Sequence, residues 1–292
     1  RALPDGSVVM VEGQGADTRS AVLHCPYHDR SDFVRLSYSW HAQAGLGRLA
    51  IERPEPDSTH LVTVHGTRPM LVGDLRDLML RLDPAGMSAN LLQVAVSDAV
   101  EPVGPAPTLT ALTPILTAEG ERPIRDLRRG DLVRTDCGAL VPVLHVVRRV
   151  VPARGGFRPI RLRAGYFGLT RNLVVAPDQR LVLHGSEVEY MFGREAVLVP
   201  ARHLVNNLSA FYADGPEMVA LYQLILPGHE PIIASGCAVE SLYVGRIRRK
   251  PEHLAASLLS GIDRNRLPEH AKPVWPVLKP FEAVTLATSR VA

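Results

Sequence analysis

The sequence predicts a mainly β protein with an N-terminal β-domain over residues 1–104 and a second all-β domain over residues 108–247. Short apolar segments of strand length follow one another along the chain, separated by turns that contain Gly or Pro, which is typical of antiparallel β folds. The segment 101–107 holds three prolines and one glycine, so it can neither extend a helix nor lie in a central strand. We therefore place a linker at residues 105–107.

Strands of the N-terminal domain are expected where apolar residues cluster or alternate. In the segment 33–40, large apolar residues alternate with small or polar ones, which is the period of a half-buried strand. The other expected strands are 8–11, 49–51, 61–64 and 91–96. One helix is expected over residues 72–82, because Leu75, Leu78, Met79 and Leu82 are spaced to form one apolar face.

The second domain is expected to contain many short strands. They fall at residues 131–134, 141–150, 158–163, 172–175, 180–183, 196–199, 218–226 and 231–234. Residues 248–292 form a C-terminal tail that we expect to dock on the domains, with a helix at 251–260 and an extended, Pro-rich arm at 268–280. The apolar residues expected to pack on the body are Trp275, Val277, Leu278 and Phe281.

Composition excludes several classes of function. The 33 basic and 30 acidic residues leave a net charge of +3, and only 5% of residues are aromatic, so we expect no nucleic-acid partner despite two clusters of basic residues around 122–129 and 246–250. No apolar run reaches the ~20 residues of a membrane-spanning helix, so we expect no membrane partner either. A protein partner is left open.

The three cysteines provide no disulfide framework and no Cys-x-x-Cys pair. The first residues do not resemble a signal peptide. Because the sequence opens at Arg1 rather than Met, a leader could already have been removed, and secretion is one of the localisations left open.

One block of sequence carries a specific pattern. Residues 115–133, ILTAEGERPIRDLRRGDLV, place Gly120 at a turn between two strands and put Ile124 and Leu127 three residues apart, as on one short helical turn. Gly130 and Asp131 then turn the chain back into a strand. This block resembles the opening of a Hedgehog/intein (Hint) domain.

Three further segments resemble the same family, in the same order along the chain, and two of these are similar to stretches of bacterial Hint proteins. They are 173–183, 197–205 and 229–242. The resemblance implies a compact, highly curved all-β domain over residues 108–247, in which the first and last strands end close together. It also implies that Thr108 lies near Gln179.

The family's chemistry needs a nucleophile at the first residue of the domain, usually Cys and sometimes Ser. That residue attacks the preceding carbonyl in an N-to-S or N-to-O acyl shift, and a Thr-x-x-His motif supports the step by protonating the leaving nitrogen. An ungapped alignment on Gly120 puts Thr108 at the nucleophile position; with a shorter loop, Thr110 or Thr113 would take it. The supporting motif becomes Ala176-Pro177-Asp178-Gln179.

These replacements predict that the chemistry is lost. A Thr hydroxyl is a weak nucleophile without an adjacent base, and Gln cannot act as a general acid or base near neutral pH. Two residues of the closing segment, His229 and Cys237, could also face the family site; we expect a hydrogen-bonded structural His and a small buried Cys. The residues assigned to the family site, and expected to be inactive, are Thr108, Gln179, Ala176, His229 and Cys237.

A metal-like cluster occurs in the N-terminal domain, in His24-Cys25-Pro26-Tyr27-His28. Imidazole and thiolate are good zinc ligands, but the spacing fits no standard site, and in a strand His24 and His28 would lie far apart. A turn at Pro26 could bring them together. We expect no bound metal and no cofactor; His24, Cys25 and His28 are the candidates if there is one.

The sequence thus favours a degenerate Hint protein that acts as a structural or binding module rather than as an enzyme. The first alternative is an active autoprocessing domain that cleaves the Pro107–Thr108 bond in cis through an N-to-O acyl shift at Thr108. A second alternative is a metal- or ligand-binding β-protein whose site lies in residues 1–104.

Overall fold

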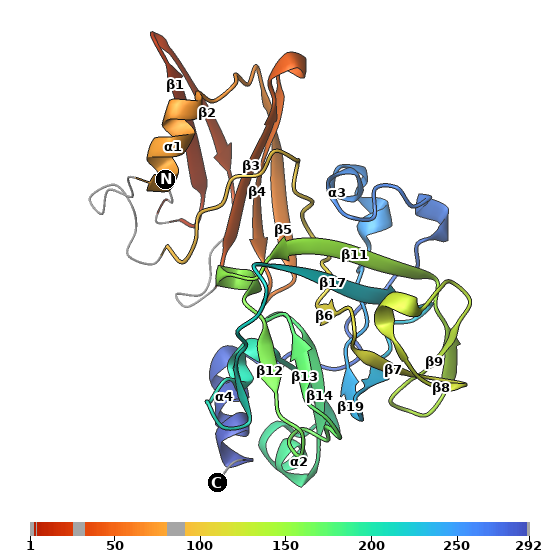
Figure 1. The fold of residues 1–292 in the computed structure, drawn as a ribbon. Helices are drawn as coiled ribbons and strands as arrows, with labels where there is room; N and C mark the ends of the chain where they lie inside the picture. The colour runs from red at the N-terminus through yellow and green to blue at the C-terminus, as the bar shows by residue number, and fades with distance from the viewer. Residues whose placement is uncertain (1–2, 4, 26–32, 81–90, 291–292) are drawn as a thin grey trace. The chain divides into compact units, whose positions relative to one another are not determined.

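The computed structural model describes residues 3, 5–25, 33–80 and 91–290. The chain divides into two compact units, Arg1–Gly104 and Pro105–Ala292 (Figure 1). The predicted mainly β fold is confirmed, since antiparallel sheets make up both units. Among the described residues, no helix has the length and apolar character needed to span a membrane.

The first unit contains a hairpin, a three-stranded meander and one helix. The hairpin pairs β1 (Val8–Gln14) with β2 (Asp17–Leu23). The meander consists of β3 (Arg35–His41), β4 (Leu46–Arg53) and β5 (Ser58–His65), followed by α1 (Val72–Leu80). Its core is a small apolar cluster made by Val8, Leu23, Cys25, Leu49, Ile51 and Val64.

One expectation for this unit is wrong, and the predicted helix is confirmed. Within the described part of the chain, the predicted strand at 91–96 forms no β-ladder, and most of its apolar side chains are exposed, with Leu92 72% exposed. The predicted helix is confirmed as α1; on its apolar face Leu75 is half-buried and Met79 is 40% exposed, and Leu82 lies outside the described residues. The spacing of apolar residues indicates which side chains an element could bury, but their burial also requires a surface to pack against.

The second unit is built from two antiparallel sheets. One follows the order β10-β9-β7-β18-β19-β14-β15, with β8 paired to β7, and the other follows β11-β17-β6-β13-β12-β16. The strands are β6 (Leu109–Thr110), β7 (Pro114–Thr117), β8 (Gly120–Pro123), β9 (Leu132–Arg134), β10 (Leu140–Pro142), β11 (His145–Pro152), β12 (Ile160–Leu162), β13 (Leu173–Val175), β14 (Arg180–His184), β15 (Ala196–Pro200), β16 (Ala210–Tyr212), β17 (Met218–Ile225), β18 (Ile232–Ala234) and β19 (Cys237–Val239).

Helices are short in this unit. The α-helices are α2 (Ser186–Phe192), α3 (Pro251–Ala256) and α4 (Pro280–Ser289). Single turns of 3₁₀ helix occur over the chain at η1 (Ala42–Ala44), η2 (Ile124–Asp126), η3 (Gly155–Phe157), η4 (Ala201–Leu204), η5 (Ile247–Arg249) and η6 (Arg264–Arg266). The predicted helix at 251–260 is therefore confirmed in position but ends at Ala256.

The segment 115–133 folds as its residues predict. β7 and β8 form a hairpin in which Gly120 takes a φ of +110°, a conformation that favours glycine. Ile124 and Leu127 lie on or next to the 3₁₀ turn η2 and are both buried in the main core. Asp131 fixes the next turn, because its carboxylate accepts a hydrogen bond from the Arg128 main-chain N–H at 2.8 Å.

The tail packs on the second unit, though partly by other means than expected. Leu278 is buried in the main core and Trp275 and Val277 contact a smaller apolar cluster. Phe281 is 66% exposed, so its predicted packing is wrong. The reason is an unpredicted helix: Pro280 begins α4, whose buried face is formed by Ala283, Leu286 and Ala287, on the side away from Phe281.

The turn between β18 and β19 predicts a sensitive substitution. Gly236 has a φ of +87°, and a Cβ there would lie 2.8 Å from Thr170 Cγ2 and 3.1 Å from the Gly168 carbonyl oxygen. We expect Gly236→Ala to lower the free energy of unfolding by about 2–4 kcal/mol, the sum of backbone strain and overpacking. Gly138→Ala is the matched control, with a φ of +86° and open space around the added Cβ. Chemical denaturation should show a clearly smaller loss for the control; equal losses would contradict the packing argument.

Candidate functional site

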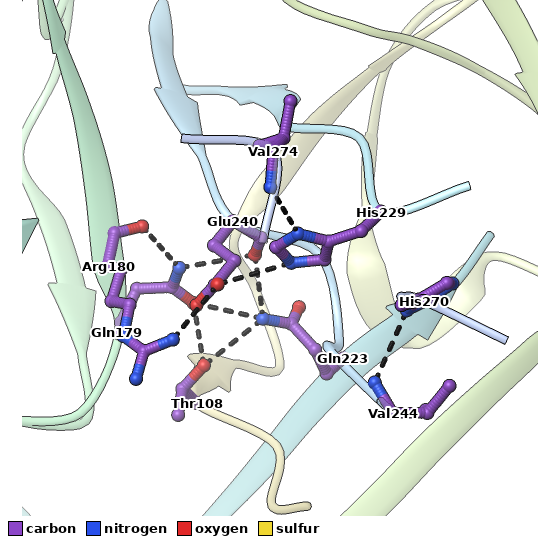
Figure 2. A network of polar contacts seen from close by, with 9 residues as sticks. All are labelled: Thr108, Gln179, Arg180, Gln223, His229, Glu240, Val244, His270 and Val274. Atoms are coloured by element: carbon purple, nitrogen blue, oxygen red, sulfur yellow. Dashed lines mark hydrogen bonds and ion pairs between the residues drawn. The ribbon is translucent and has the colours of Figure 1, made fainter. Parts of the chain in front are cut away.

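A buried polar network forms where four segments of the second unit meet (Figure 2). Thr108 precedes β6, Gln179 precedes β14, Gln223 lies within β17 and Glu240 follows β19. These residues are respectively 8%, 1%, 2% and 8% exposed, so the network is almost sealed from solvent. Because β6 pairs with both β13 and β17, the sheet itself brings Thr108 and Gln223 together.

Main-chain hydrogen bonds hold the loop that carries Gln179. The Ala176 N–H donates to the Thr108 carbonyl at 2.7 Å, and the Gln179 N–H donates to the Ala176 carbonyl at 3.0 Å. The Gln179 carbonyl in turn accepts from the Ala201 N–H at 2.8 Å. These contacts explain how the segment 176–179 reaches Thr108, and the Ala176 side chain itself packs in a small apolar cluster with Val151 and Leu221.

The Thr108 hydroxyl is engaged both as a donor and as an acceptor. Thr108 Oγ1 donates to Gln179 Oε1 at 2.6 Å and accepts from Gln223 Nε2 at 3.1 Å. Gln223 Nε2 also lies 3.1 Å from Gln179 Oε1 and 2.9 Å from the Glu240 carbonyl oxygen. The three side chains therefore form a closed ring of hydrogen bonds, as Figure 2 shows.

The side-chain nitrogen of Gln179 is hydrogen-bonded to main-chain carbonyls. Gln179 Nε2 donates to the Arg180 carbonyl at 2.8 Å and to the Glu240 carbonyl at 3.2 Å. Because the nitrogen has two acceptors, the Gln179 oxygen must be the atom that faces Thr108. An amide oxygen can hold the hydroxyl proton of Thr108 in a hydrogen bond, but it cannot remove that proton near neutral pH.

A charged cluster adjoins the ring of hydrogen bonds through Glu240. Arg180 Nη1 lies 3.2 Å and His229 Nε2 lies 3.1 Å from the same carboxylate oxygen, Glu240 Oε1. All three side chains are nearly buried, at 5%, 3% and 11% exposed for Arg180, His229 and Glu240. His229 is thus directed at the Glu240 carboxylate, and its other ring nitrogen, Nδ1, accepts from the Val274 N–H at 3.1 Å.

Cys237 lies in β19 and belongs to the main hydrophobic core. Burial raises the pKa of the Cys237 thiol to about 12. Its hydrogen-bond partner is the Ala238 carbonyl, at 3.4 Å, rather than a residue of the Thr108 network. A thiol that stays protonated and packed in the core has the properties of a small apolar residue.

The histidine and cysteine cluster of the first unit is only partly described. Cys25 is buried in the apolar core of that unit, and His24 Nδ1 lies 3.1 Å from Ser7 Oγ. His28 and Pro26 lie outside the described residues. Within the described part of the chain, no three His, Cys, Asp or Glu side chains are grouped so that they could hold a metal ion.

Two residues of the network were missed by the sequence analysis. Gln223 is a single polar residue in the apolar strand Met218–Ile225, and a buried polar residue in such a strand is itself a signal. Glu240 is similar, because it follows the buried strand β19 and precedes Ser241, which is 1% exposed. Both positions could have been singled out by asking which polar residues interrupt an apolar run.

The comparisons with known proteins identify the class of this domain. A family model described as a Hint domain matches residues 107–246. Residues 107–246 are therefore a Hint domain, and the protein is a Hint-domain protein. No curated protein matches the chain.

Several solved structures are similar to about half of the chain. The MchDnaB-1 intein is 13% identical, covers 46% of this chain and 98% of its own, and gives a TM-score of 0.33. The bacterial intein-like domain from Clostridium thermocellum is 17% identical, covers 47% of this chain and 99% of its own, and gives a TM-score of 0.32. The gp41-1 intein is 13% identical, with coverages of 46% and 97% and a TM-score of 0.31.

Proposed function

We propose that this Hint domain no longer cleaves itself and serves as a structural or binding module, over residues 108–247, with the tail 248–292 docked on it. The observation that carries the proposal is the hydrogen bond of 2.6 Å from Thr108 Oγ1 to Gln179 Oε1. It joins the residue at the nucleophile position to a side chain that neither takes up nor supplies a proton near neutral pH.

The chemistry of an acyl shift explains why this contact matters. For cleavage at Pro107–Thr108, the hydroxyl oxygen must attack the Pro107 carbonyl carbon while its proton leaves, and the Thr108 nitrogen must gain a proton as the C–N bond breaks. General acid–base assistance is typically worth ~10²–10⁴-fold in rate. The hydroxyl is instead held between two carboxamide groups, from Gln179 and Gln223.

Electrostatics of the neighbourhood support the same proposal. The imidazole of the charged cluster, His229, lies 3.1 Å from the Glu240 carboxylate and accepts a hydrogen bond from the Val274 main-chain N–H. Nδ1 of that ring accepts a hydrogen bond from Val274, and Nε2 faces the Glu240 carboxylate rather than the Thr108 hydroxyl. The ring of hydrogen bonds therefore acts as an internal clamp that ties the start of the domain to β14, β17 and the end of β19.

A repair experiment tests the proposal. We expect the double variant Thr108→Cys with Gln179→His to release the fragment 1–107 when treated with dithiothreitol. The variant regains a thiol nucleophile at position 108 and an imidazole at position 179, which is 71 residues away in sequence but in contact with residue 108. Adding Ala176→Thr would rebuild the rest of the supporting motif. Mass spectrometry of the products measures the cleavage.

Single variants serve as matched controls and separate the effect of the missing thiol from that of the missing imidazole. Thr108→Cys alone should cleave much more slowly than the double variant, and Gln179→His alone should not cleave at all. If the native chain cleaves at Thr108 as fast as the repaired one, the domain is an active autoprocessing domain and the proposal is wrong.

A further inference from the structure

Residues 268–277 form a strap between two buried anchors. On one side Leu267 packs in the apolar cluster around Ile225 and Leu259, and on the other side Leu278 packs in the main core. Three prolines, at 268, 273 and 276, keep the strap extended. Near its end it adds to the edge strand β15, since the Leu198 N–H donates to the Pro276 carbonyl at 2.8 Å and the Leu278 N–H donates to the Leu198 carbonyl at 2.9 Å.

Two buried histidines fasten the strap to the domain. His229 Nδ1 accepts from the N–H of Val274, which belongs to the strap, at 3.1 Å. His270, which is a strap residue, accepts from the Val244 N–H on its Nδ1 at 3.3 Å, and its Nε2 faces the Leu226 carbonyl at 3.2 Å. Figure 2 shows both rings beside the polar network.

These hydrogen bonds require both rings to be neutral. A nitrogen that accepts from a main-chain N–H cannot carry a proton, so each ring must have its single proton on Nε2. Protonation would turn Nδ1 into a donor that faces another donor. Each of the two fastening bonds is therefore lost when its own ring gains a charge.

The surroundings also oppose a charge on both rings at once. The ring centroids of His229 and His270 are 5.5 Å apart, and Tyr243 lies 5.0 Å from the first and 6.0 Å from the second. Glu240 is the anion of the cluster, and its Oε1 lies 3.2 Å from Arg180 Nη1 and 3.1 Å from His229 Nε2. Two charged residues belong to the strap itself: Glu269, which is paired with Arg248 and Arg249, and the exposed Lys272.

We propose that acid releases the strap: protonation of His270 frees residues 268–277 from the domain and uncovers the charged cluster and the edge of β15. The anchors at Leu267 and Leu278 remain in place, so the strap opens as a loop and the Hint domain stays folded. Trp275 and Val277 cover a cluster of apolar side chains, and release of the strap exposes it. The cluster consists of Val182, Ala196, Leu198 and Ala238.

The direction of the pH dependence follows from burial. Burial lowers the pKa of His270 from its ordinary value of 6.5 to about 4. The closed strap binds fewer protons than the open one between these values, so closure is fully favoured above about pH 6.5 and weakens as the pH falls to about 4. Hydrogen bonds from Arg249 and Arg248 lower the pKa of Glu269 to about 2, so these ion pairs stay formed between pH 4 and 6.5.

Fluorescence of Trp275 in the full chain reports the opening. The chain has two tryptophans, so Trp40→Phe leaves Trp275 as the only one. As the pH falls from about 7 to about 4, we expect a red shift of Trp275 emission and stronger acrylamide quenching, while far-UV circular dichroism stays unchanged. Adding His270→Asn should abolish the transition, because the Asn Oδ1 takes the position of His Nδ1 and accepts the Val244 N–H bond at every pH.

A measurement on the native chain avoids dependence on these variants. The amides of Val244 and Val274 should lose protection against hydrogen exchange, corrected for intrinsic rates, by a factor of at least about ten over the same pH range. A factor of ten corresponds to one pKa unit. The Leu278 amide, which bonds to Leu198, is the internal reference for the fixed anchor. Unchanged Trp275 emission and unchanged protection down to about pH 4 would overturn the proposal.

Discussion

Replacing Glu240 by alanine is expected to lower the free energy of unfolding of the second unit by about 3–5 kcal/mol, because it leaves a buried Arg180 without this ion pair. The Glu240 carboxylate contacts both Arg180 and His229, at 3.2 and 3.1 Å, and both partners are almost inaccessible to solvent. Against a total stability of about 5–15 kcal/mol for a typical domain, such a loss is large. Urea denaturation followed by circular dichroism measures it.

A surface ion pair of the same unit provides the control. Glu187 lies 3.1 Å from Arg290 but is 47% exposed, so Glu187→Ala should cost less than about 1 kcal/mol. Glu240→Gln, which keeps the shape and loses the charge, should fall between the two. A cost for Glu240→Ala as small as that of the control would show that the buried charges are easily rehydrated, and the cluster would then contribute little to the fold.

Removing the side chain of Leu181 should have an effect of similar size. Leu181 is 0% exposed in β14, and that strand pairs with β15 on one side and β19 on the other, so the site has little freedom to collapse. We expect Leu181→Ala to destabilise the unit by about 3–5 kcal/mol, through lost burial and the cavity left behind. Thermal or chemical denaturation gives the value.

Leu208→Ala is the natural comparison for this variant. The Leu208 side chain is 43% exposed, and we expect a loss within about 0.5 kcal/mol. If Leu181→Ala cost no more than Leu208→Ala, the main core could not be packed around β14 as described.

Periodicity along the chain was sufficient to predict the fold class and many strands. The alternation over residues 33–40 predicts β3, and the apolar run at 180–183 predicts β14. The same reasoning missed β2, because its first four residues, 17–20, are polar and only its last three are apolar; its pairing with β1 is made by the main chain. It also placed a strand at 91–96, where the described residues form no β-ladder.

The candidate site was predictable in part, for a related reason. The resemblance to Hint domains drew attention to Thr108 and Gln179, which the structure places in direct contact. Gln223, in β17, and Glu240, just after β19, are far away in sequence, 115 residues from Thr108 in the case of Gln223, and only the folded sheet brings them together. Local pattern carries no information on such contacts, whereas a polar residue inside a buried strand is a usable signal.

The most direct test of the proposed loss of self-cleavage is the intact mass of the native chain over several days, with and without a strong thiol or hydroxylamine. With Thr108 held by Gln179 and Gln223, we predict a single species with the mass of the full 292 residues under every condition. Accumulation of the two fragments 1–107 and 108–292, accelerated by hydroxylamine through an ester at Thr108, would contradict it.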